Sequence, residues 1–266
     1  MNSQELLREI SDELKSNEWK NKRFNIFNAL GVESRENSHS AFIANLLNPQ
    51  GTHECANLFL RTFMDMLTKK YLDVEKITKK LADNVFVEVE KDLGNDSRVD
   101  IWIKKSNENY YLLIENKIDA SDEPLQLLRY RNYLGRCEKV GKNTDGENRN
   151  GVLVYLTVNG KDADPTSTNG EIKKGEDYHT ISYNKEIKGW LKFCVEMNLP
   201  SRVKSAIEQY LELIEYLTIN IETSKKLLPK ITDIAVIDKA LKSKESKGEV
   251  KWILDYLRYS FKQKTN

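Results

Sequence analysis

The chain has 266 residues, enough for one large domain or two small ones with a proper core. Hydrophobic residues make up 39% of it and charged residues 31%, which excludes a disordered or fibrous protein. The formal net charge of +1 argues against a protein that coats nucleic acid by charge alone, so any basic surface must be local.

Cysteine usage and the N-terminus favour a cytoplasmic protein. Cys55, Cys137 and Cys194 form no CxxC pair, and their odd number argues against a disulfide framework. Charged residues interrupt the first apolar residues, so we find no signal-peptide core. The most apolar stretches, Tyr110–Ile114 and Val152–Val158, are too short to span a bilayer. We therefore expect a cytoplasmic protein that does not cross a membrane.

The first third of the chain is predicted to be helical. Apolar residues recur at helical spacing over 6–14 and again over 42–47. Ser34 is the expected cap of the second helix. This helix should end near Asn48-Pro49, because proline disfavours helix in the residue before it. A third helix is expected over 54–70.

The middle of the chain is predicted to contain strands. Apolar and polar residues alternate over 85–90 and over 99–103 with the period of two that is typical of a strand. The run 110–114 is apolar on both faces and should form a central strand with material packed on each side. A helix over about 123–137 and a strand over 152–156 should follow.

The last third is again mostly helical. A short strand over 180–183 and a helix containing Trp190 precede a helical region that begins near Arg202. Helices, three strands, a helix, a strand and further helices imply an α/β fold. We predict an N-terminal helical extension, a core domain and a C-terminal helical region packed on the core, over 1–33, 34–200 and 201–266.

Charged residues stand at unusual places in the two middle strands. Asp100 lies inside an alternating strand, and Glu115 and Lys117 follow the most apolar run. Residues i and i+2 of a strand share one face, so Glu115 and Lys117 should lie on the same side. If the hairpin closes with Lys105 opposite Tyr110, Asp100 lies directly across from Glu115, with their Cβ atoms about 4.5–5.5 Å apart.

Two carboxylates this close repel each other unless a cation lies between them. Such oxygen-rich sites suit Mg²⁺ or Mn²⁺, and a lysine beside them suits phosphodiester hydrolysis. The alternative is a salt-bridge cluster on a solvated sheet face, with Lys117 simply pairing with Glu115; the charge pattern alone leaves both open. Glu88 and Glu90 are interpreted as the solvated face of an edge strand, although one of them could face the site.

At this point the residues resemble a known family. Asp100 followed by Glu115-Asn116-Lys117 is similar to the D…(D/E)xK signature of the PD-(D/E)XK nuclease superfamily, and it lies in the expected strand–turn–strand–helix context. Gln126 and Tyr130 in the following helix resemble the QxxxY motif of the branch with lambda-type and recombination-type exonucleases. The chain departs from the pattern at Val99, where the superfamily has its nominal proline.

The N-terminal part also resembles a branch of this superfamily. The segment 36–40 leading into 42–49, and His53 followed by Leu58-Phe59-Leu60, are similar to an uncharacterised family with an E..HS helix and an LLxP ending. The resemblance implies that this helix supplies an acid or a histidine to the metal site, with Glu36 as the first candidate and His39 as the second. Glu36 could instead stabilise the helix dipole. His53 is interpreted as a structural or surface histidine.

The resemblance implies a restriction-endonuclease-like α-β-β-β-α-β core, with a mixed central sheet flanked by helices, and a metal-dependent phosphodiesterase. Asp100 and Glu115 would bind Mg²⁺ or Mn²⁺, with the backbone carbonyl of Asn116 as a further ligand. Lys117 would assist the attacking water. Only three scattered cysteines are present, so we expect no iron–sulfur cluster of the kind that some relatives carry.

The expected substrate is DNA, and Gln126 and Tyr130 would position the strand, unless Tyr130 belongs to the core and Gln126 is exposed. The resemblance is compatible with defence against foreign DNA or with repair, as a homodimer or in a larger complex. The alternatives are a catalytically inactive nuclease-fold module that binds nucleic acid or a partner, and a structural α/β interaction protein.

Overall fold

The computed structural model describes residues 1–16, 24–118, 120–140, 150–246, 250–251, 253–254 and 257–258. The chain divides into two compact units. We call Val32–Leu211 the α/β unit, and Met1–Gly31 together with Glu212–Asn266 the helical unit. The domain limits predicted from the sequence, 1–33, 34–200 and 201–266, stay a prediction.

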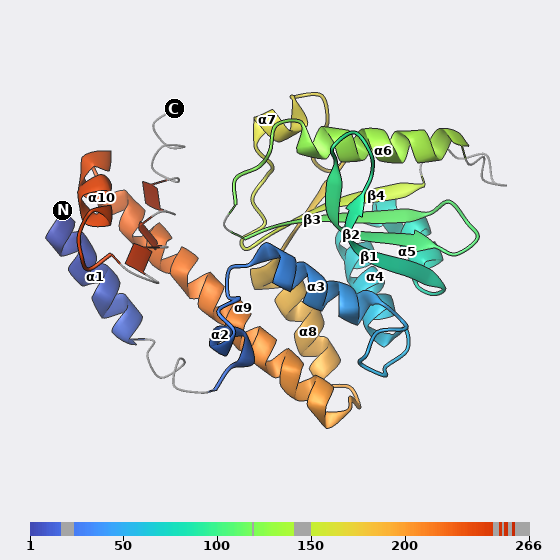
Figure 1. Ribbon diagram of the computed structural model, residues 1–266, viewed down its shortest axis with the longest axis horizontal. Helices are drawn as coiled ribbons and strands as arrows, with labels where there is room; N and C mark the ends of the chain where they lie inside the picture. The colour runs from blue at the N-terminus through green and yellow to red at the C-terminus, as the bar shows by residue number, and fades with distance from the viewer. Residues whose placement is uncertain are drawn as a thin grey trace. The chain divides into compact units, whose positions relative to one another are not determined.

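The α/β unit is built around a mixed sheet of five strands in the order β1-β2-β3-β4-β5 (Figure 1). The strands are β1 (Val85–Asp92), β2 (Arg98–Lys105), β3 (Tyr111–Lys117), β4 (Gly151–Thr157) and β5 (His179–Ser182). The β1–β2 and β2–β3 pairs are antiparallel, whereas β3–β4 and β4–β5 are parallel. All the predicted strands are therefore present, in the predicted order along the chain.

Strand β3 is central, as its apolar composition predicts. Every residue of β3 and of β4 is buried, which requires material on both faces of the sheet. One face packs against α6 (Gln126–Val140). There Leu127 and Leu134 of the helix join Leu113 of β3 in one apolar cluster.

Three helices lie on the other side of the sheet from α6 (Figure 1): α3 (Glu36–Leu47), α4 (Leu58–Lys70) and α5 (Glu75–Leu81). Of these, α3 and α5 contact β2 and β3 directly. Side chains along β3 therefore point alternately toward α6 and toward this helical layer. This alternation decides the surroundings of each residue at the end of β3.

The starts of three helices differ from the prediction. The helix expected to begin at Glu54 begins at Leu58, because Glu54 and Ala56 have φ values of 59° and 48°, which a right-handed helix does not allow. Helix α6 begins only at Gln126, because Leu125 has a φ of 60°. Ser34 does not cap α3: Arg35 occupies the cap position and makes no side-chain hydrogen bond there. The end of α3 just before Asn48-Pro49 is as predicted.

Several short elements were not predicted. They are α2, a 3₁₀ turn, α5, α7 and a π-helical turn, over Ile26–Ala29, Leu72–Val74, Glu75–Leu81, Pro165–Thr168 and Tyr183–Ile187. Each has at most seven residues, too short for hydrophobic periodicity to stand out. The helix predicted around Trp190 is α8 (Lys188–Val195).

The helical unit has its own apolar core. Helices α1 (Ser3–Ser16) and α10 (Ile234–Leu241) are in contact, and Leu6, Ile10 and Ile237 belong to one buried cluster. The helical region predicted from Arg202 on begins with α9 and a 3₁₀ turn, over Ser201–Leu227 and Leu228–Lys230. In the part of the chain that the structure describes, no helix is both long and apolar enough to cross a membrane.

Because β3 is buried on both faces, truncation of Leu113 should destabilise the α/β unit. Leu113 is fully buried, and we expect Leu113→Ala to lower the free energy of unfolding by about 2–5 kcal/mol. Phe86→Ala is the control, because Phe86 lies on the same sheet but is 60% exposed. Urea denaturation of the two variants checks the prediction, and equal effects would contradict it.

Candidate active site

The candidate site is built on the antiparallel pair β2–β3. The backbone N–H of Lys105 donates to the carbonyl of Tyr110 at 3.0 Å, which is the predicted closure of the hairpin. The same register, carried to the far end of the pair, sets Asp100 opposite Glu115. Asp100, Glu115 and Lys117 all line one pocket, so the three side chains face the same side of the sheet.

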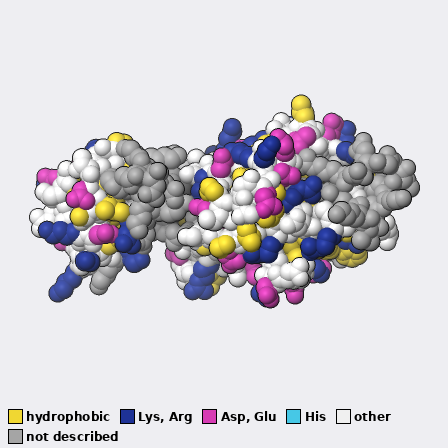
Figure 2. Space-filling view, turned by 90° about the horizontal axis from the view of Figure 1, so that it is seen from above, with side chains coloured by type: hydrophobic (Ala, Val, Ile, Leu, Met, Phe, Trp, Pro, Cys, Tyr) yellow, Lys and Arg dark blue, Asp and Glu magenta, His cyan; other side chains and the backbone are white. Residues whose placement is uncertain are grey.

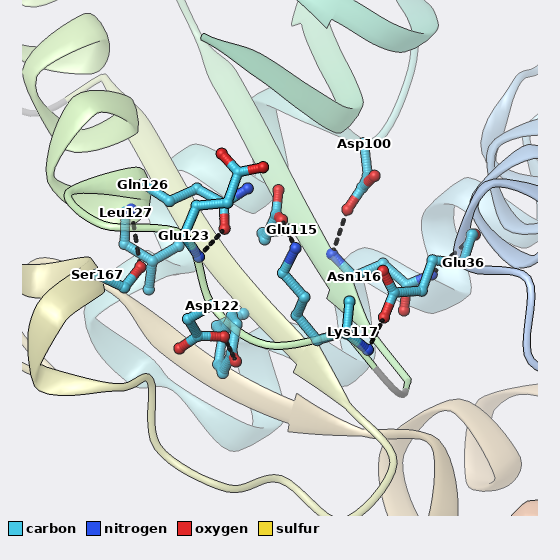
Figure 3. A network of polar contacts seen from close by, with 12 residues as sticks. Glu36, Asp100, Glu115, Asn116, Lys117, Asp122, Glu123, Gln126, Leu127 and Ser167 are labelled. Carbon is cyan, nitrogen blue, oxygen red and sulfur yellow. Dashed lines mark hydrogen bonds and ion pairs between the residues drawn. The ribbon is translucent and has the colours of Figure 1, made fainter.

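Glu115 and Lys117 form a buried ion pair (Figure 3). The distance from Glu115 Oε1 to Lys117 Nζ is 2.9 Å, and the exposed fractions of the two residues are 2% and 8%. The other carboxylate oxygen of Glu115, Oε2, is buried and has no hydrogen-bond partner among the described residues. Leaving a buried acceptor unsatisfied costs about 1–3 kcal/mol. A cation or a hydrogen-bond donor fits at this oxygen.

Burial controls the protonation of these groups. Burial raises the pKa of Asp100 to about 8, and repulsion from Glu115 adds to the shift. The Asn116 N–H, which donates to Asp100 Oδ2 at 2.6 Å, opposes it. Burial also raises the pKa of Glu115, against the effect of Lys117. Burial alone would lower the pKa of Lys117, but Glu115 raises it overall, so the amine stays charged.

Glu36 is the first residue of α3, and its carboxylate reaches the segment that follows β3 (Figure 3). Its Oε1 accepts the backbone N–H of Ile118 at 2.7 Å and that of Ala120 at 3.0 Å. Glu36 also lines the pocket that contains Asp100. The structure therefore brings Glu36 to the site, where it orders the chain directly after Lys117.

The side chain of Asn116 points to the other face of the sheet and ties β3 to α3. Its Nδ2 donates to the carbonyl of Glu36 at 3.1 Å and to Ser40 Oγ at 3.0 Å. The Tyr183 hydroxyl donates to Asn116 Oδ1 at 2.9 Å. This buried network positions the start of α3 relative to β3. The sequence analysis missed it, because the strand pattern says nothing about which helix covers that face.

The two histidines of the N-terminal segment have structural contacts. His39 Nδ1 is 2.7 Å from the Tyr210 hydroxyl, and Nε2 is 2.9 Å from the Glu33 carbonyl. Burial lowers the pKa of His39 to about 4, so the ring is neutral near pH 7. His53 Nε2 is 2.9 Å from the Asn48 carbonyl. Neither His39 nor His53 lines the pocket.

Helix α6 brings Gln126 and Tyr130 to the pocket. Gln126 Nε2 donates to the Tyr130 hydroxyl at 3.1 Å, and this hydroxyl donates to the Arg98 carbonyl at 2.5 Å. Gln126 is 6% exposed, so the alternative of an exposed glutamine is wrong, whereas Tyr130 does belong to the core. Their role in binding a substrate stays a prediction.

The pocket has a volume of about 620 Å³ and a mainly acidic lining. The carboxyl side chains are those of Glu36, Glu90, Asp92, Asp96, Asp100, Glu115 and Glu123. The basic side chains are those of Arg98, Lys117 and Arg129. A lining with this excess of acids attracts cations and repels a polyanion until cations neutralise it.

Glu90 belongs to this lining, although the sequence analysis favoured a solvated edge position for it. Strand β1 is indeed the edge of the sheet, but its register with β2 sets Glu90 opposite Asp100. Glu90 has a φ of 51°, which is uncommon for a residue other than glycine. Alternation along β1 indicated that Glu88 and Glu90 share a face, but not that this face is the one with Asp100.

The donor set fits a hard divalent cation. Among the described residues no group of three or more His, Cys, Asp and Glu side chains is arranged to hold a metal ion. Mg²⁺ needs no such cage, because one or two carboxylates and water molecules suffice. Asp100 and Glu115, with the unpaired Oε2 of Glu115, supply two carboxylates. The Asn116 N–H points at Asp100, so its carbonyl lies on that side as well.

Comparison with known proteins finds a family match over most of the chain. A family model described as the PD-(D/E)XK nuclease superfamily matches residues 24–218, which include all five strands. No curated protein matches the chain, and no solved structure matches it. The resemblance to the superfamily is confirmed, and so is the restriction-endonuclease-like fold class, whereas the resemblance to particular branches stays a prediction.

The raised pKa of Asp100 predicts how the stability of the metal-free protein depends on pH. The folded protein binds this proton more tightly than the unfolded chain, so stability should fall as the pH rises from about 4 to about 8. Asp100→Asn removes the buried charge and should flatten this fall, making the variant more stable than wild type at pH 8 by about 1 kcal/mol or more.

The control for this measurement is Asp96→Asn, because Asp96 is an exposed acid at the rim of the same pocket. Thermal unfolding in EDTA at several pH values provides the measurement. A wild-type protein that becomes more stable between pH 5 and pH 8 relative to Asp100→Asn would contradict the prediction.

Proposed function

Because the chain belongs to the PD-(D/E)XK nuclease superfamily, we propose that it is a metal-dependent nuclease that hydrolyses phosphodiester bonds of DNA. One observation carries the proposal. Asp100, Glu115 and Lys117 face a single pocket, and Glu115 keeps a buried oxygen with no partner among the described residues. A salt-bridge cluster on a solvated sheet face, the alternative reading, would leave these groups in contact with water.

In this proposal Asp100 and Glu115 bind Mg²⁺ or Mn²⁺, with the Asn116 carbonyl as a further ligand. The metal, when bound, polarises the phosphoryl group and lowers the pKa of bound water. A bound cation would offset the burial and the repulsion from Glu115 that raise the pKa of Asp100, so both acids could be ionised together. The burial of Glu115 and the partial burial of Asp100 support the proposal, because such burial is unfavourable for stability alone.

Lys117 acts as a charged donor. Its ammonium group lies 2.9 Å from Glu115 and faces the same pocket, so it can orient the attacking water or stabilise the charge that develops on the phosphate. Its raised pKa argues against a role as general base at neutral pH. We therefore assign Lys117 no proton-accepting role.

Glu36 and the QxxxY pair complete the proposed machinery. Glu36 accepts hydrogen bonds from two backbone N–H groups that follow Lys117. These bonds hold the segment directly after the lysine against the start of α3. Gln126 and Tyr130 hold β2 and α6 together at the pocket and present polar atoms to a substrate strand. We propose that Glu36 supports the metal site and that Gln126 and Tyr130 position the substrate strand.

The first test is cleavage. We expect the wild-type protein to cut members of a panel of DNA and RNA substrates in Mg²⁺ or Mn²⁺. Lys117→Ala should cut at least about 10²-fold more slowly, because a preorganised charge at the reacting group is lost. Lys104→Ala is the matched control: Lys104 lies on the neighbouring strand β2 and does not line the pocket. No cleavage by the wild type, or equal rates for Lys117→Ala, would contradict the proposal.

The second test separates an enzyme from an inactive binding module. Calorimetry should detect Mn²⁺ uptake by the wild type, and Asp100→Asn or Glu115→Gln should weaken it by about tenfold or more, since each removes one of two carboxylate ligands. Asp96→Asn again serves as the control within the same pocket. If the Asp100 and Glu115 variants bind Mn²⁺ as well as the wild type does, the metal binds elsewhere and these two residues are not its ligands.

A further inference from the structure

Buried polar atoms without a hydrogen-bond partner gather at the candidate active site. Among the described residues, such atoms include Glu115 Oε2, Ser97 Oγ and Arg129 Nε. Ser97, Glu115 and Arg129 all line the acidic pocket. The metal assigned above accounts for Glu115 only. The Arg129 guanidinium only donates hydrogen bonds and the Ser97 hydroxyl can donate one, so a single acceptor could satisfy both atoms.

The guanidinium group of Arg129 is held so that one of its edges is available. Nη1 donates to the carbonyl of Pro124 at 2.7 Å, which anchors the group. Nη2 has only a long contact of 3.4 Å with Glu123, whose side chain is 66% exposed, and Nε has no partner. Nε and Nη2 form the edge with which arginine binds two oxygens of one phosphate. An incoming phosphate would replace the exposed Glu123 carboxylate at Nη2 and would also have to reach Nε, which is buried.

Ser97 lies where this helix meets the start of β2. The Tyr130 hydroxyl, next to Arg129, donates to the carbonyl of Arg98, next to Ser97, at 2.5 Å. The Leu93 N–H donates to the Ser97 carbonyl at 2.8 Å and closes the loop between β1 and β2. Ser97 is 5% exposed, and its hydroxyl can donate a hydrogen bond into the pocket. Two hydrogen-bond donors without a partner among the described residues, Arg129 Nε and the Ser97 hydroxyl, thus belong to α6 and to the start of β2, which a hydrogen bond joins.

The charge of the pocket explains why such donors matter. On the face shown in Figure 2, Lys and Arg side chains are interspersed with Asp and Glu, so no broad basic surface is seen there. Inside the pocket, carboxyl groups outnumber basic groups. A nucleic-acid strand therefore needs local contacts besides the metal, and an arginine that binds a phosphate with two N–H groups supplies a strong one.

We propose that Arg129, together with Ser97, binds a phosphate of the nucleic-acid strand that is not the one being cleaved. This subsite rests on the proposed nuclease function and deepens it, because it makes the position of a second phosphate a determinant of where the strand is cut. The subsite recognises two oxygens of one phosphate. Both an internal phosphodiester and a terminal phosphomonoester have such a pair of oxygens.

The experiment measures binding of a short single-stranded DNA, labelled at its 3′ end, to the full-length protein in Ca²⁺ at several salt concentrations. One probe has a 5′-hydroxyl and the other a 5′-phosphate. Arg129→Gln should weaken binding on the order of tenfold and reduce the salt slope by about 0.7, the loss of one phosphate contact on a single strand. Weakening with both probes identifies an internal phosphate, and weakening with the phosphorylated probe alone identifies a terminal one.

Further variants distinguish the contribution of the paired N–H groups to binding from the contribution of charge and from an effect of misfolding. Arg129→Lys keeps the charge but lacks the paired N–H groups, so it should remain about threefold or more weaker than wild type. Ser97→Ala should weaken binding several-fold without any change of charge. Arg131→Gln is the control, because Arg131 lies on the same helix, pairs with Asp177 and does not line the pocket. Thermal unfolding shows whether each variant is folded.

The results distinguish the subsite from the function on which it rests. If the wild type binds and cuts DNA but Arg129→Gln and Ser97→Ala bind like wild type, the subsite is overturned and the nuclease proposal stands. Full affinity in Arg129→Lys overturns recognition through the paired N–H edge. If the wild type neither binds nor cuts any probe, both proposals fail together.

Discussion

The antiparallel register of β2 and β3 is the constraint on which the candidate site depends. Side chains along a strand alternate between faces, so a slip of one residue would send Asp100 to the side opposite Glu115. The hairpin bond between Lys105 and Tyr110 prevents such a slip at one end. Because β3 is buried on both faces, each of its side chains also has only one acceptable side. The same packing that stabilises the sheet thus holds two acids together.

Burial has opposite consequences for stability and for chemistry at this site. A buried pair such as Glu115 and Lys117 contributes little to stability, since the cost of desolvation offsets the attraction. The same desolvation raises the pKa of Asp100 and leaves Glu115 with an unpaired oxygen. Groups kept in this state gain most from a cation, because charges interact more strongly away from water. The way in which the sheet is covered therefore leaves these groups in a state that a bound cation would stabilise.

Side chains on the two faces of β3 make different contacts. Glu115 and Lys117 point toward α6 and the pocket, whereas Asn116 between them points toward α3. The amide of Asn116 binds the backbone of Glu36, and the carboxylate of Glu36 returns to the chain just after Lys117. This closed set of hydrogen bonds couples the position of the N-terminal helix to that of the lysine. The middle residue of the motif is thus a structural link between β3 and α3.

The sequence by itself determined the strands, their order and the pairing of Asp100 with Glu115, because alternation of apolar residues and the length of a hairpin loop are local properties. It also determined the family, through the motif and its context. Only the tertiary structure decided that Glu90 faces the site, that His39 is held by structural contacts, and that Arg129 has an available edge. These depend on left-handed residues such as Leu125 and on which helix covers each face. Contacts between segments distant in the chain leave no periodic trace in the sequence.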